Sequence, residues 1–278
     1  MFSLKNYIDC SKADFIFISE PQIFRSDLPA CTYPCKDEYY VELNSEDKLD
    51  EEASMTKSKA YGGTLLMWKK SLDQYISVFP SPSTSFLPIV YSPPGSPVSA
   101  HIALYLPTSG KESDFLEQII LLSNCIDEMT EKYEDCLVFL RGDANVNNNN
   151  KPRSEIFSNF LSKHNLAQAP ILHKTYHHFL GGGSFDSNID IVAYPSHAPY
   201  REEIVRIFCK HEFPDIDSHH DIIMSSVDLP VTAYITPELD LITAPKFDHT
   251  RYKIAWSEDG IEKFKEEVVP LLSDLRLR

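Results

Sequence analysis

Short apolar runs rich in aromatic and β-branched residues recur along this chain, and several of them end at an acidic residue. Residues 15–19 are Phe-Ile-Phe-Ile-Ser and lead into Glu20, while residues 137–140 are Leu-Val-Phe-Leu and lead into Arg141-Gly142-Asp143. Runs of this length and composition predict buried strands. The chain is therefore expected to build a sheet whose strand ends carry polar side chains.

Two amphipathic helices are predicted among these strands. Apolar residues at helical spacing predict one helix at about 111–131, and Pro152 marks the start of a second, because proline is favoured in the first helical turn. Strands that alternate with helices favour a layered α/β sandwich. Further strands are predicted at 64–68, 101–106, 189–193, 204–209 and 222–226.

Two segments of the predicted sandwich lack a clear pattern. Residues 25–60 are highly charged and have little periodicity, so they are predicted to form a long surface loop. Residues 80–98 are dense in proline and serine and are predicted to interrupt the strands without dividing the domain.

The character of the chain changes near residue 231. Pro237 and Pro245 punctuate a stretch typical of a linker. Residues 257–276 place apolar residues on one helix face, and Pro270 is expected to kink or divide that helix. We therefore divide the chain into a domain at 1–230 and a linker with a C-terminal helix at 231–278.

The composition is that of a globular protein. At 278 residues, with 42% hydrophobic and 24% charged residues, the chain can bury its own core without disulfides. No stretch approaches the roughly 18 apolar residues that span a bilayer, so no membrane partner is expected. The N-terminus lacks a signal-peptide pattern, and the six cysteines show no zinc-ligand spacing. Reduced thiols and an intracellular location are predicted.

The formal net charge of −15 limits the partners that the chain can bind tightly. Neutralisation of phosphates by Lys and Arg supplies most nonspecific DNA affinity, and here 41 acids outnumber 26 bases. The excess is uneven, because residues 36–54 are especially acidic. This balance disfavours tight electrostatic binding of DNA but is compatible with metal-assisted chemistry at a carboxylate cluster.

Five short motifs follow one another, each at a predicted strand end or turn. They are Ser19-Glu20-Pro21, Leu104-Tyr105-Leu106-Pro107, Arg141-Gly142-Asp143-Ala144-Asn145, Ser187-Asn188-Ile189-Asp190 and Ser218-His219-His220-Asp221. In this order they resemble the motifs of the endonuclease/exonuclease/phosphatase superfamily over roughly residues 5–228. The resemblance implies a four-layer α/β/β/α sandwich and metal-dependent phosphodiester hydrolysis, with Mg²⁺ as the expected ion and Mn²⁺ as an alternative.

The resemblance implies roles for three residues in the first half of this series. Glu20 would bind the metal, and Asp143 would orient or deprotonate the attacking water. Asn145 would hold that water or a phosphate oxygen, because side chains two apart at a strand end can face one cleft. The alternative for Asp143 and Asn145 is a turn stabilised by their own side chains, and for Glu20 a solvated strand end.

The resemblance also implies roles for a histidine and its neighbours. His220 would place its imidazole on the scissile phosphate, and Asp190 would accept the other ring N–H and fix the tautomer. Tyr105 would contribute a phenol near the phosphate, although such a tyrosine is more often part of a core. His177 and His178 are expected to point to opposite faces of a strand and not to bind one ion together.

Within the superfamily, the chain most resembles the endonuclease domain of non-LTR (LINE-type) retrotransposons. Residues 218–223 resemble that branch's Ser-Asp-His tail, and residues 175–190 resemble its hairpin, which there helps to choose the target site. Residues 251–256 resemble a connector toward a reverse transcriptase. The resemblance implies DNA as the substrate, the nucleus as the location, and a reverse transcriptase domain as partner in the parent element. It leaves the oligomeric state open.

Two features depart from the family pattern. The family begins with a strand that carries an asparagine near its end, whereas this chain opens in what resembles the following helix. The predicted sandwich therefore lacks its first strand. His219 stands where the family usually has aspartate, and imidazole is a poorer ligand for Mg²⁺ than carboxylate but suits Mn²⁺. His219 is placed with Glu20 in the predicted metal site.

Three functions are compatible with the sequence. The leading one is a DNA-nicking endonuclease of retrotransposon type. The second is a phosphatase or phosphodiesterase on a smaller substrate, which the acidic balance favours. The third is a catalytically inactive remnant or binding module, for which the absent first strand is the main argument.

Overall fold

The computed structural model describes most of the predicted sandwich. All the described residues belong to a compact unit within residues 1–233. The linker and helix predicted from residue 231 onward, and Ser218 of the last motif, lie outside the described residues. No helix in the described part of the chain is long and apolar enough to cross a membrane. The described ranges are 12–45, 62–108, 110–147, 150–172, 174–180, 183–197, 202–208 and 219–229.

A six-stranded sheet forms one central layer, in the order β4-β5-β6-β7-β11-β8. Strands β6 and β7 run parallel, and the other neighbouring pairs are antiparallel. The C-terminal ends of β6 and β7 therefore lie side by side at the same end of the sheet, where Tyr105 pairs with Asp143. The strands are β4 (Ile76–Val78), β5 (Phe86–Tyr91), β6 (Ser99–Tyr105), β7 (Leu137–Asp143), β8 (Leu166–Gln168) and β11 (Asp190–Pro195).

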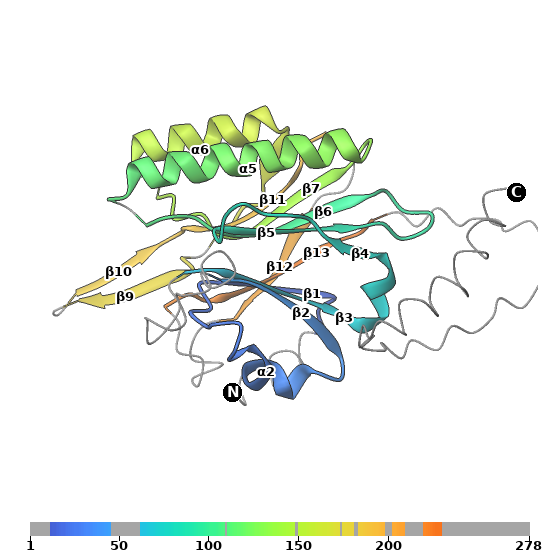
Figure 1. Ribbon diagram of the computed structural model, residues 1–278. Coiled ribbons are helices and arrows are strands. Elements are labelled where there is room, and N and C mark those ends of the chain that lie inside the picture. Colours follow the sequence, from blue (N-terminus) through green and yellow to red (C-terminus); the bar gives the residue numbers. More distant parts are fainter. Residues whose placement is uncertain are drawn as a thin grey trace, which may run out of the picture. The chain divides into compact units, whose positions relative to one another are not determined.

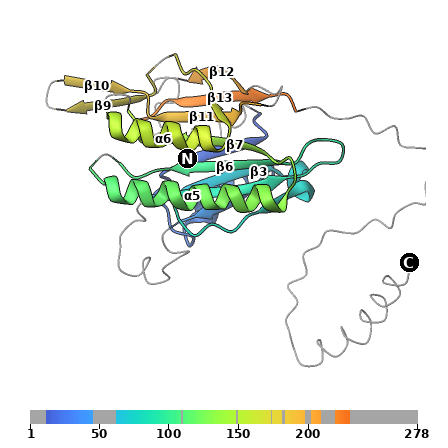
Figure 2. The same cartoon turned by 90° about the horizontal axis from the view of Figure 1, so that it is seen from above.

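Helices α5 (Glu112–Lys132) and α6 (Lys151–Lys163) lie side by side over one face of this sheet (Figures 1 and 2). Both were predicted from apolar periodicity, and both are confirmed. Phe115, Leu122 and Met129 of α5 are fully buried in the core that the helices share with the sheet. The Asn150 side chain caps α6 by accepting from the backbone N–H of Arg153.

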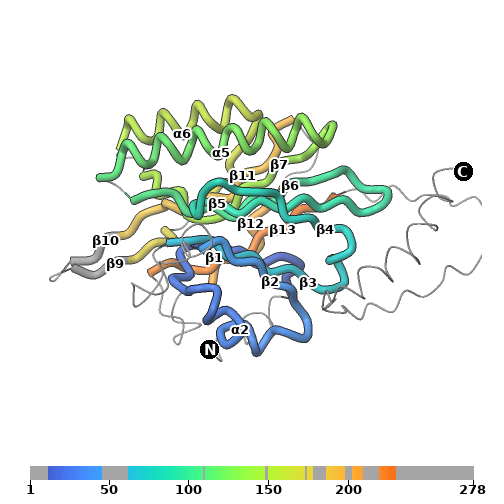
Figure 3. The backbone as a smooth tube through the Cα atoms, viewed as in Figure 1, coloured from blue at the N-terminus to red at the C-terminus, as the bar shows by residue number. Residues whose placement is uncertain are grey.

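A three-stranded antiparallel sheet, in the order β1-β3-β2, faces the first sheet (Figure 3). A core between the sheets includes Leu66, Trp68, Leu87, Ile89 and Ala103. Helix α2 lies beyond the smaller sheet, so the layers are helix, sheet, sheet and helix, as predicted (Figure 1). The elements are β1 (Phe15–Ser19), α2 (Leu28–Thr32), η1 (Tyr33–Cys35), β2 (Tyr39–Asn44), β3 (Thr64–Lys69) and η2 (Lys70–Tyr75).

The prediction of a surface loop at 25–60 was wrong for its first half. Elements α2, η1 and β2 lie inside this segment, and Tyr39 and Leu43 of β2 are buried. Their apolar alternation covers few residues and is surrounded by charges, so it did not stand out. The prediction for 80–98 was wrong about the interruption, because β5 lies there and buries Leu87 and Ile89 between the sheets, and it is confirmed that the segment does not divide the domain.

Two antiparallel hairpins follow α6 in the chain. The first pairs β9 (Tyr176–Leu180) with β10 (Gly183–Ser187), and the second pairs β12 (Glu202–Phe208) with β13 (Ile222–Val227). An isolated bridge between Tyr176 and His220 joins the start of β9 to the residues before β13.

A series of hydrogen-bonded polar side chains crosses between the layers. The His101 ring stacks between the rings of Phe15 and Phe139, with centroid distances of 4.8 and 5.2 Å. Arg141 donates to His101 Nδ1 at 2.9 Å, so His101 Nε2 carries the proton and donates to Ser99 Oγ at 2.9 Å. Arg141 Nε also donates to Glu202 Oε1 at 2.6 Å. These hydrogen bonds thereby connect β6 and β7 to β12.

Candidate active site

A cavity of about 1480 Å³ is lined by β1, by β13 and by the polar ends of β6, β7 and β11. The seven residues predicted for the site all line it, so the structure brings them to one place. They are Glu20, Tyr105, Asp143, Asn145, Asp190, His219 and His220.

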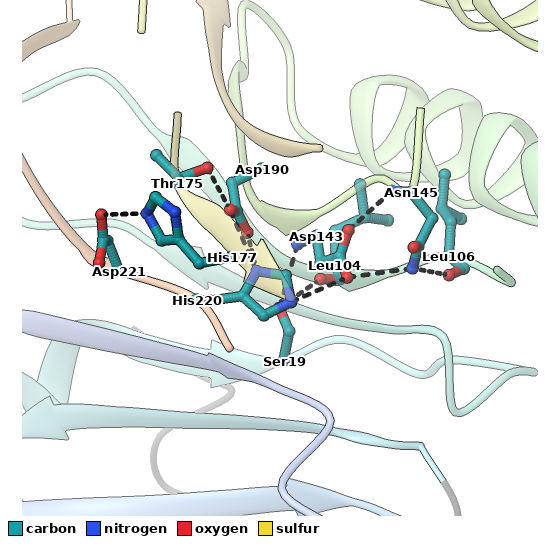
Figure 4. Close-up of polar contacts among 10 residues, drawn as sticks. All are labelled: Ser19, Leu104, Leu106, Asp143, Asn145, Thr175, His177, Asp190, His220 and Asp221. Atoms are coloured by element: carbon teal, nitrogen blue, oxygen red, sulfur yellow. Dashed lines mark hydrogen bonds and ion pairs between the residues drawn. The ribbon is translucent and has the colours of Figure 1, made fainter. Parts of the chain in front are cut away.

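His220 is held by Asp190 at the start of β11 (Figure 4). His220 Nδ1 lies 3.0 and 3.1 Å from the two carboxylate oxygens of Asp190. The Thr175 hydroxyl donates to Asp190 Oδ2 at 2.5 Å, and Thr175 is fully buried. A carboxylate accepts the Nδ1 proton, so Nε2 is the ring atom that faces Asp143, at 3.8 Å from its Oδ2.

Asp143 occupies a tightly built position at the end of β7. Its backbone N–H donates to Ser19 Oγ at 3.1 Å, and the Ser19 hydroxyl donates to the carbonyl of Leu104 at 2.7 Å. The preceding Gly142 has a φ of +138°, and a Cβ there would collide with the Leu104 carbonyl. Glycine is thus required for β7 to pass β6 and β1 this closely.

Asn145 binds the carboxylate of Asp143 from two directions. Its backbone N–H donates to Asp143 Oδ1 at 2.8 Å and its Nδ2 to Asp143 Oδ2 at 3.0 Å. Nδ2 also donates to the Leu106 carbonyl at 2.8 Å. Asn145 has a φ of +50°, and Arg153 holds its carbonyl at 3.1 Å. These contacts make Asn145 a positioning residue for Asp143. Because they use the backbone N–H and Nδ2, the predicted contact of Asn145 with water or phosphate would be made by its Oδ1.

The electrostatics of the site raise the pKa values of both Asp143 and His220. Burial, followed by the negative charge of Asp190, raises the pKa of Asp143 from 3.8 to about 7. Burial alone would lower the pKa of His220, but the hydrogen bond and charge of Asp190, with Asp143 and Glu20, raise it. Asp143 can therefore gain or lose a proton near neutral pH, and His220 keeps its proton to a higher pH than a free imidazole.

Glu20 and Tyr105 lie on the same cavity, on different elements. Glu20 follows β1 directly with a φ of +52°, and its Oε1 accepts from the Gln22 side chain at 3.0 Å. Tyr105 ends β6 and is buried, and its ring packs against Gly62, where a Cβ would lie 3.2 Å from the ring. The core contact expected for a lone tyrosine is thus present beside the cavity lining.

His219 and His177 differ in what they contact. His219 is exposed, and its ring lies edge-on to Tyr176 at 6.2 Å. His177, which sequence reasoning set aside, contacts Asp221 through Nε2 at 3.1 Å and Asp186 through Nδ1 at 3.0 Å. The position of Asp221 directly after His220 was the one sequence signal that could have pointed to this contact.

The donor atoms available at the site fit a hard divalent cation. Asp143, Asp190 and Glu20 concentrate negative charge, which adds to the larger effect of burial in raising the pKa of Asp143. Among the described residues, no three His, Cys, Asp or Glu side chains are grouped as ligands of one ion. Mg²⁺ commonly uses one or two protein carboxylates and completes its shell with water and phosphate oxygens. The oxygen donors of the site are therefore of the kind that a hard divalent cation uses.

Comparison with family models gives no match, and comparison with curated proteins gives none either. Solved structures do match. The endonuclease domain of TRAS1, a telomere-specific non-LTR retrotransposon, aligns with a TM-score of 0.55 and 14% identity over 82% of this chain and 92% of that one.

Two further solved structures share the architecture. An endonuclease/exonuclease/phosphatase family protein from Leptotrichia buccalis aligns with a TM-score of 0.55 and 12% identity, over 81% of this chain and 91% of that one. ANGEL2, a 2',3'-cyclic phosphatase, aligns with a TM-score of 0.52 and 12% identity, over 84% and 77%. The layers, the strand order and these similarities together identify the fold of this chain as the endonuclease/exonuclease/phosphatase fold.

Proposed function

We propose that this chain is a metal-dependent phosphodiesterase that nicks DNA, in the manner of a retrotransposon endonuclease. The observation that carries the proposal is the seating of His220 between Asp190 and Asp143, with Nδ1 at 3.0 Å from Asp190 and Nε2 at 3.8 Å from Asp143. An imidazole held by one carboxylate and turned toward a second, buried one is suited to acid–base and charge-stabilising work at a phosphate.

Each side chain has a defined task in the hydrolysis. Asp143 accepts a proton from the attacking water, whose oxygen bonds to phosphorus as the bond from phosphorus to the leaving oxygen breaks. His220 donates from Nε2 to a nonbridging phosphate oxygen, where negative charge develops. Asp190 accepts the Nδ1 proton of His220 and favours the protonated ring, which also carries the Nε2 proton to be donated, and Thr175 holds Asp190.

The metal would be held by Glu20, with His219 as a second candidate from the same cavity. When bound, a divalent cation supplies positive charge to a phosphate oxygen and to the leaving oxygen. Glu20 supplies a hard oxygen ligand, whereas the nitrogen of His219 favours Mn²⁺ over Mg²⁺. The metal requirement is therefore expected to be met by either ion.

The hairpin β9–β10 supports DNA as the substrate. It projects from the layers of the sandwich (Figure 1), and its first residue, Tyr176, lines the cavity and bridges to His220. A projecting hairpin that begins at the catalytic imidazole can contact a duplex groove while the scissile phosphate lies in the cavity. DNA in the nucleus, and a reverse transcriptase domain in the parent element, belong to the same proposal.

A nicking assay on supercoiled plasmid, in Mg²⁺ and separately in Mn²⁺, tests the proposal. The unaltered chain should convert supercoiled to open-circular DNA, and Asp143→Ala should abolish this. Asp114→Ala removes an exposed carboxylate on α5 and serves as the matched control. Equal nicking by the Asp143→Ala protein would exclude the proposed role of Asp143.

A smaller substrate is the second candidate function. The net charge of −15 disfavours a long polyanion, and one structural neighbour is described as a 2',3'-cyclic phosphatase. Release of phosphate from a nucleoside 2',3'-cyclic phosphate or a nucleotide, without plasmid nicking, would support this candidate. Absence of both activities in both metals would support a binding module without catalysis.

A further inference from the structure

The cavity continues beyond the catalytic residues, along the edges of β1 and β13. Among the described residues, β1 pairs with β3 alone and β13 pairs with β12 alone. All five residues of β1 and all six of β13 line the cavity. Successive side chains of a strand point to opposite faces, so a cavity lined by every residue lies at the strand's edge. We call this part of the cavity, bordered by Phe15–Ser19 and Ile222–Val227, the strand slot.

The hydrogen-bonding direction of β1 follows from its pairing with β3. Lys69 donates its backbone N–H to the Asp14 carbonyl at 3.1 Å, and Glu20 donates its own to the Gly63 carbonyl at 3.0 Å. Backbone groups alternate in direction along an antiparallel strand. Phe15 and Phe17 therefore direct their N–H and C=O groups to the outer edge, into the strand slot, while Ile16 and Ile18 bond to β3.

A buried acceptor in the same cavity needs a donor. Glu202 is 3% exposed, and its Oε1 accepts from Arg141 at 2.6 Å and from Ser225 at 2.5 Å. Its Oε2 is buried and has no hydrogen-bond partner within the described part of the chain. Leaving a buried acceptor unsatisfied costs free energy. Glu202 lines the cavity, so an N–H or a cationic group of an occupant can satisfy Oε2 once the side chains that cover this atom shift.

The two sides of the strand slot differ in polarity. Ile16, Ile18, Ile222 and Met224 belong to one apolar cluster on one side. Arg141 and Glu202 line the cavity on the other side. An occupant strand that satisfies both sides has apolar side chains on one face and hydrogen-bond donors on the other.

We propose that the strand slot binds an extended segment of a separate polypeptide, which adds as a strand between β1 and β13. The main-chain groups of the segment bond to the two strand edges, as in β-strand addition. One face of the segment is apolar, and the other carries lysine, arginine or amide side chains toward Glu202. The chain's net charge of −15 favours a basic segment. Binding of this segment does not depend on whether the chain cleaves phosphodiesters.

A fluorescent peptide that alternates valine with lysine, of about seven residues, is the probe, because this length spans β13 at about 3.4 Å per residue. Binding is measured by anisotropy on the full chain. Amide hydrogen exchange is then compared with and without the peptide. The amides of Phe15 and Phe17 should become protected, whereas those of Ile16 and Ile18, already bonded to β3, should be unchanged. Binding without this alternation would overturn the proposal, and so would absence of binding.

Two variants test the acceptor. Glu202→Gln should raise the dissociation constant of the peptide by about tenfold, because a hydrogen bond to a charged group is lost. Glu203→Gln, at the exposed neighbouring position of β12, should leave it unchanged. Equal binding by the two variants contradicts the assignment. Protection of Phe15 and Phe17 that grows with protein concentration, without peptide, would assign the slot to a second copy of the chain and overturn the separate partner.

Discussion

His177 Nε2 lies 3.1 Å from Asp221 Oδ2, and this contact joins the β9–β10 hairpin to the start of β13. The hydrogen bond with Asp186, opposed by burial and helped by Asp221, raises the pKa of His177. A protonated His177 thus bridges two carboxylates. Asp221 directly follows His220, so the bridge also fixes the backbone that carries the His220 imidazole, the proposed catalytic group.

We predict that His177→Ala lowers kcat for plasmid nicking by about tenfold or more, because residues that orient a functional side chain carry effects of this size. KM should change little, since His177 does not contact the phosphate. His197→Ala, in the exposed turn after β11, is the control. Kinetics and thermal unfolding are measured on both proteins. A fall in the unfolding temperature with kcat unchanged would make His177 purely structural.

Asp143→Asn should remove catalysis and relieve a cost of folding. The folded pKa of Asp143 is raised from 3.8 to about 7, first by burial and then by Asp190. The unfolded carboxyl loses its proton at lower pH than the folded one, so the contribution of Asp143 to stability falls as pH rises from about 4 to 7. Asparagine cannot ionise.

The stability of Asp143→Asn relative to the unaltered chain should therefore increase from about pH 4 to pH 8, by an amount on the order of a few kcal/mol. Thermal or urea unfolding in a metal chelator measures the difference. Asp114→Asn should give no such trend, because Asp114 is exposed. A pH-independent difference for Asp143→Asn would show that the carboxyl is not held protonated.

His101 should make the fold sensitive to acid. Burial, and then the charge of Arg141, hold the pKa of His101 well below 6.5. In the unfolded chain His101 takes up a proton below about pH 6.5, but in the folded chain it stays neutral. Its contribution to stability is therefore complete above that pH and falls by about 1.4 kcal/mol per unit below it. His101→Phe should be less stable at neutral pH but should show a shallower loss between about pH 6.5 and 5. Parallel curves would contradict this account.

Gly142→Ala should destabilise the chain far more than Gly110→Ala. Both glycines have positive φ, at +138° and +90°, so alanine is strained at either position. A Cβ at Gly110 meets nothing within 4 Å, whereas one at Gly142 collides with the Leu104 carbonyl. We expect a loss of about 1 kcal/mol at Gly110 and at least about 3 kcal/mol at Gly142, measured by urea unfolding. Similar losses of unfolding free energy in the two variants would mean that β6 and β7 can move apart at Gly142 to make room for the methyl group.

The sequence predicted the parts of this fold that repeat a local pattern. Helices α5 and α6 have long apolar faces, and β1 and β7 are short apolar runs with Glu20 and Asp143 at their ends. Strand β2 was missed, because its alternation is short and the charges around it dominate the composition.

The sequence could not predict pairs that meet through packing alone. Arg141 and Glu202 form an ion pair although 61 positions separate them, and the contact depends on where β12 lies against β7. His177 and Asp221 meet for a similar reason, since a hairpin must first dock beside β13. The seven predicted site residues line one cavity because each belongs to a motif at a strand end, and their roles stay predictions.

Backbone hydrogen bonds between the start of the β9–β10 hairpin and the residues just before β13 limit how the hairpin can be exchanged. His177 donates its backbone N–H to the His219 carbonyl at 2.7 Å, and Asp221 donates to the Thr175 carbonyl at 2.7 Å. The residues that start the hairpin therefore also fix the position of His220 in the cavity wall. A loop taken from another protein to change target choice must be spliced in after His177. Splicing at Thr175 would replace part of the support of the His220 imidazole together with the hairpin.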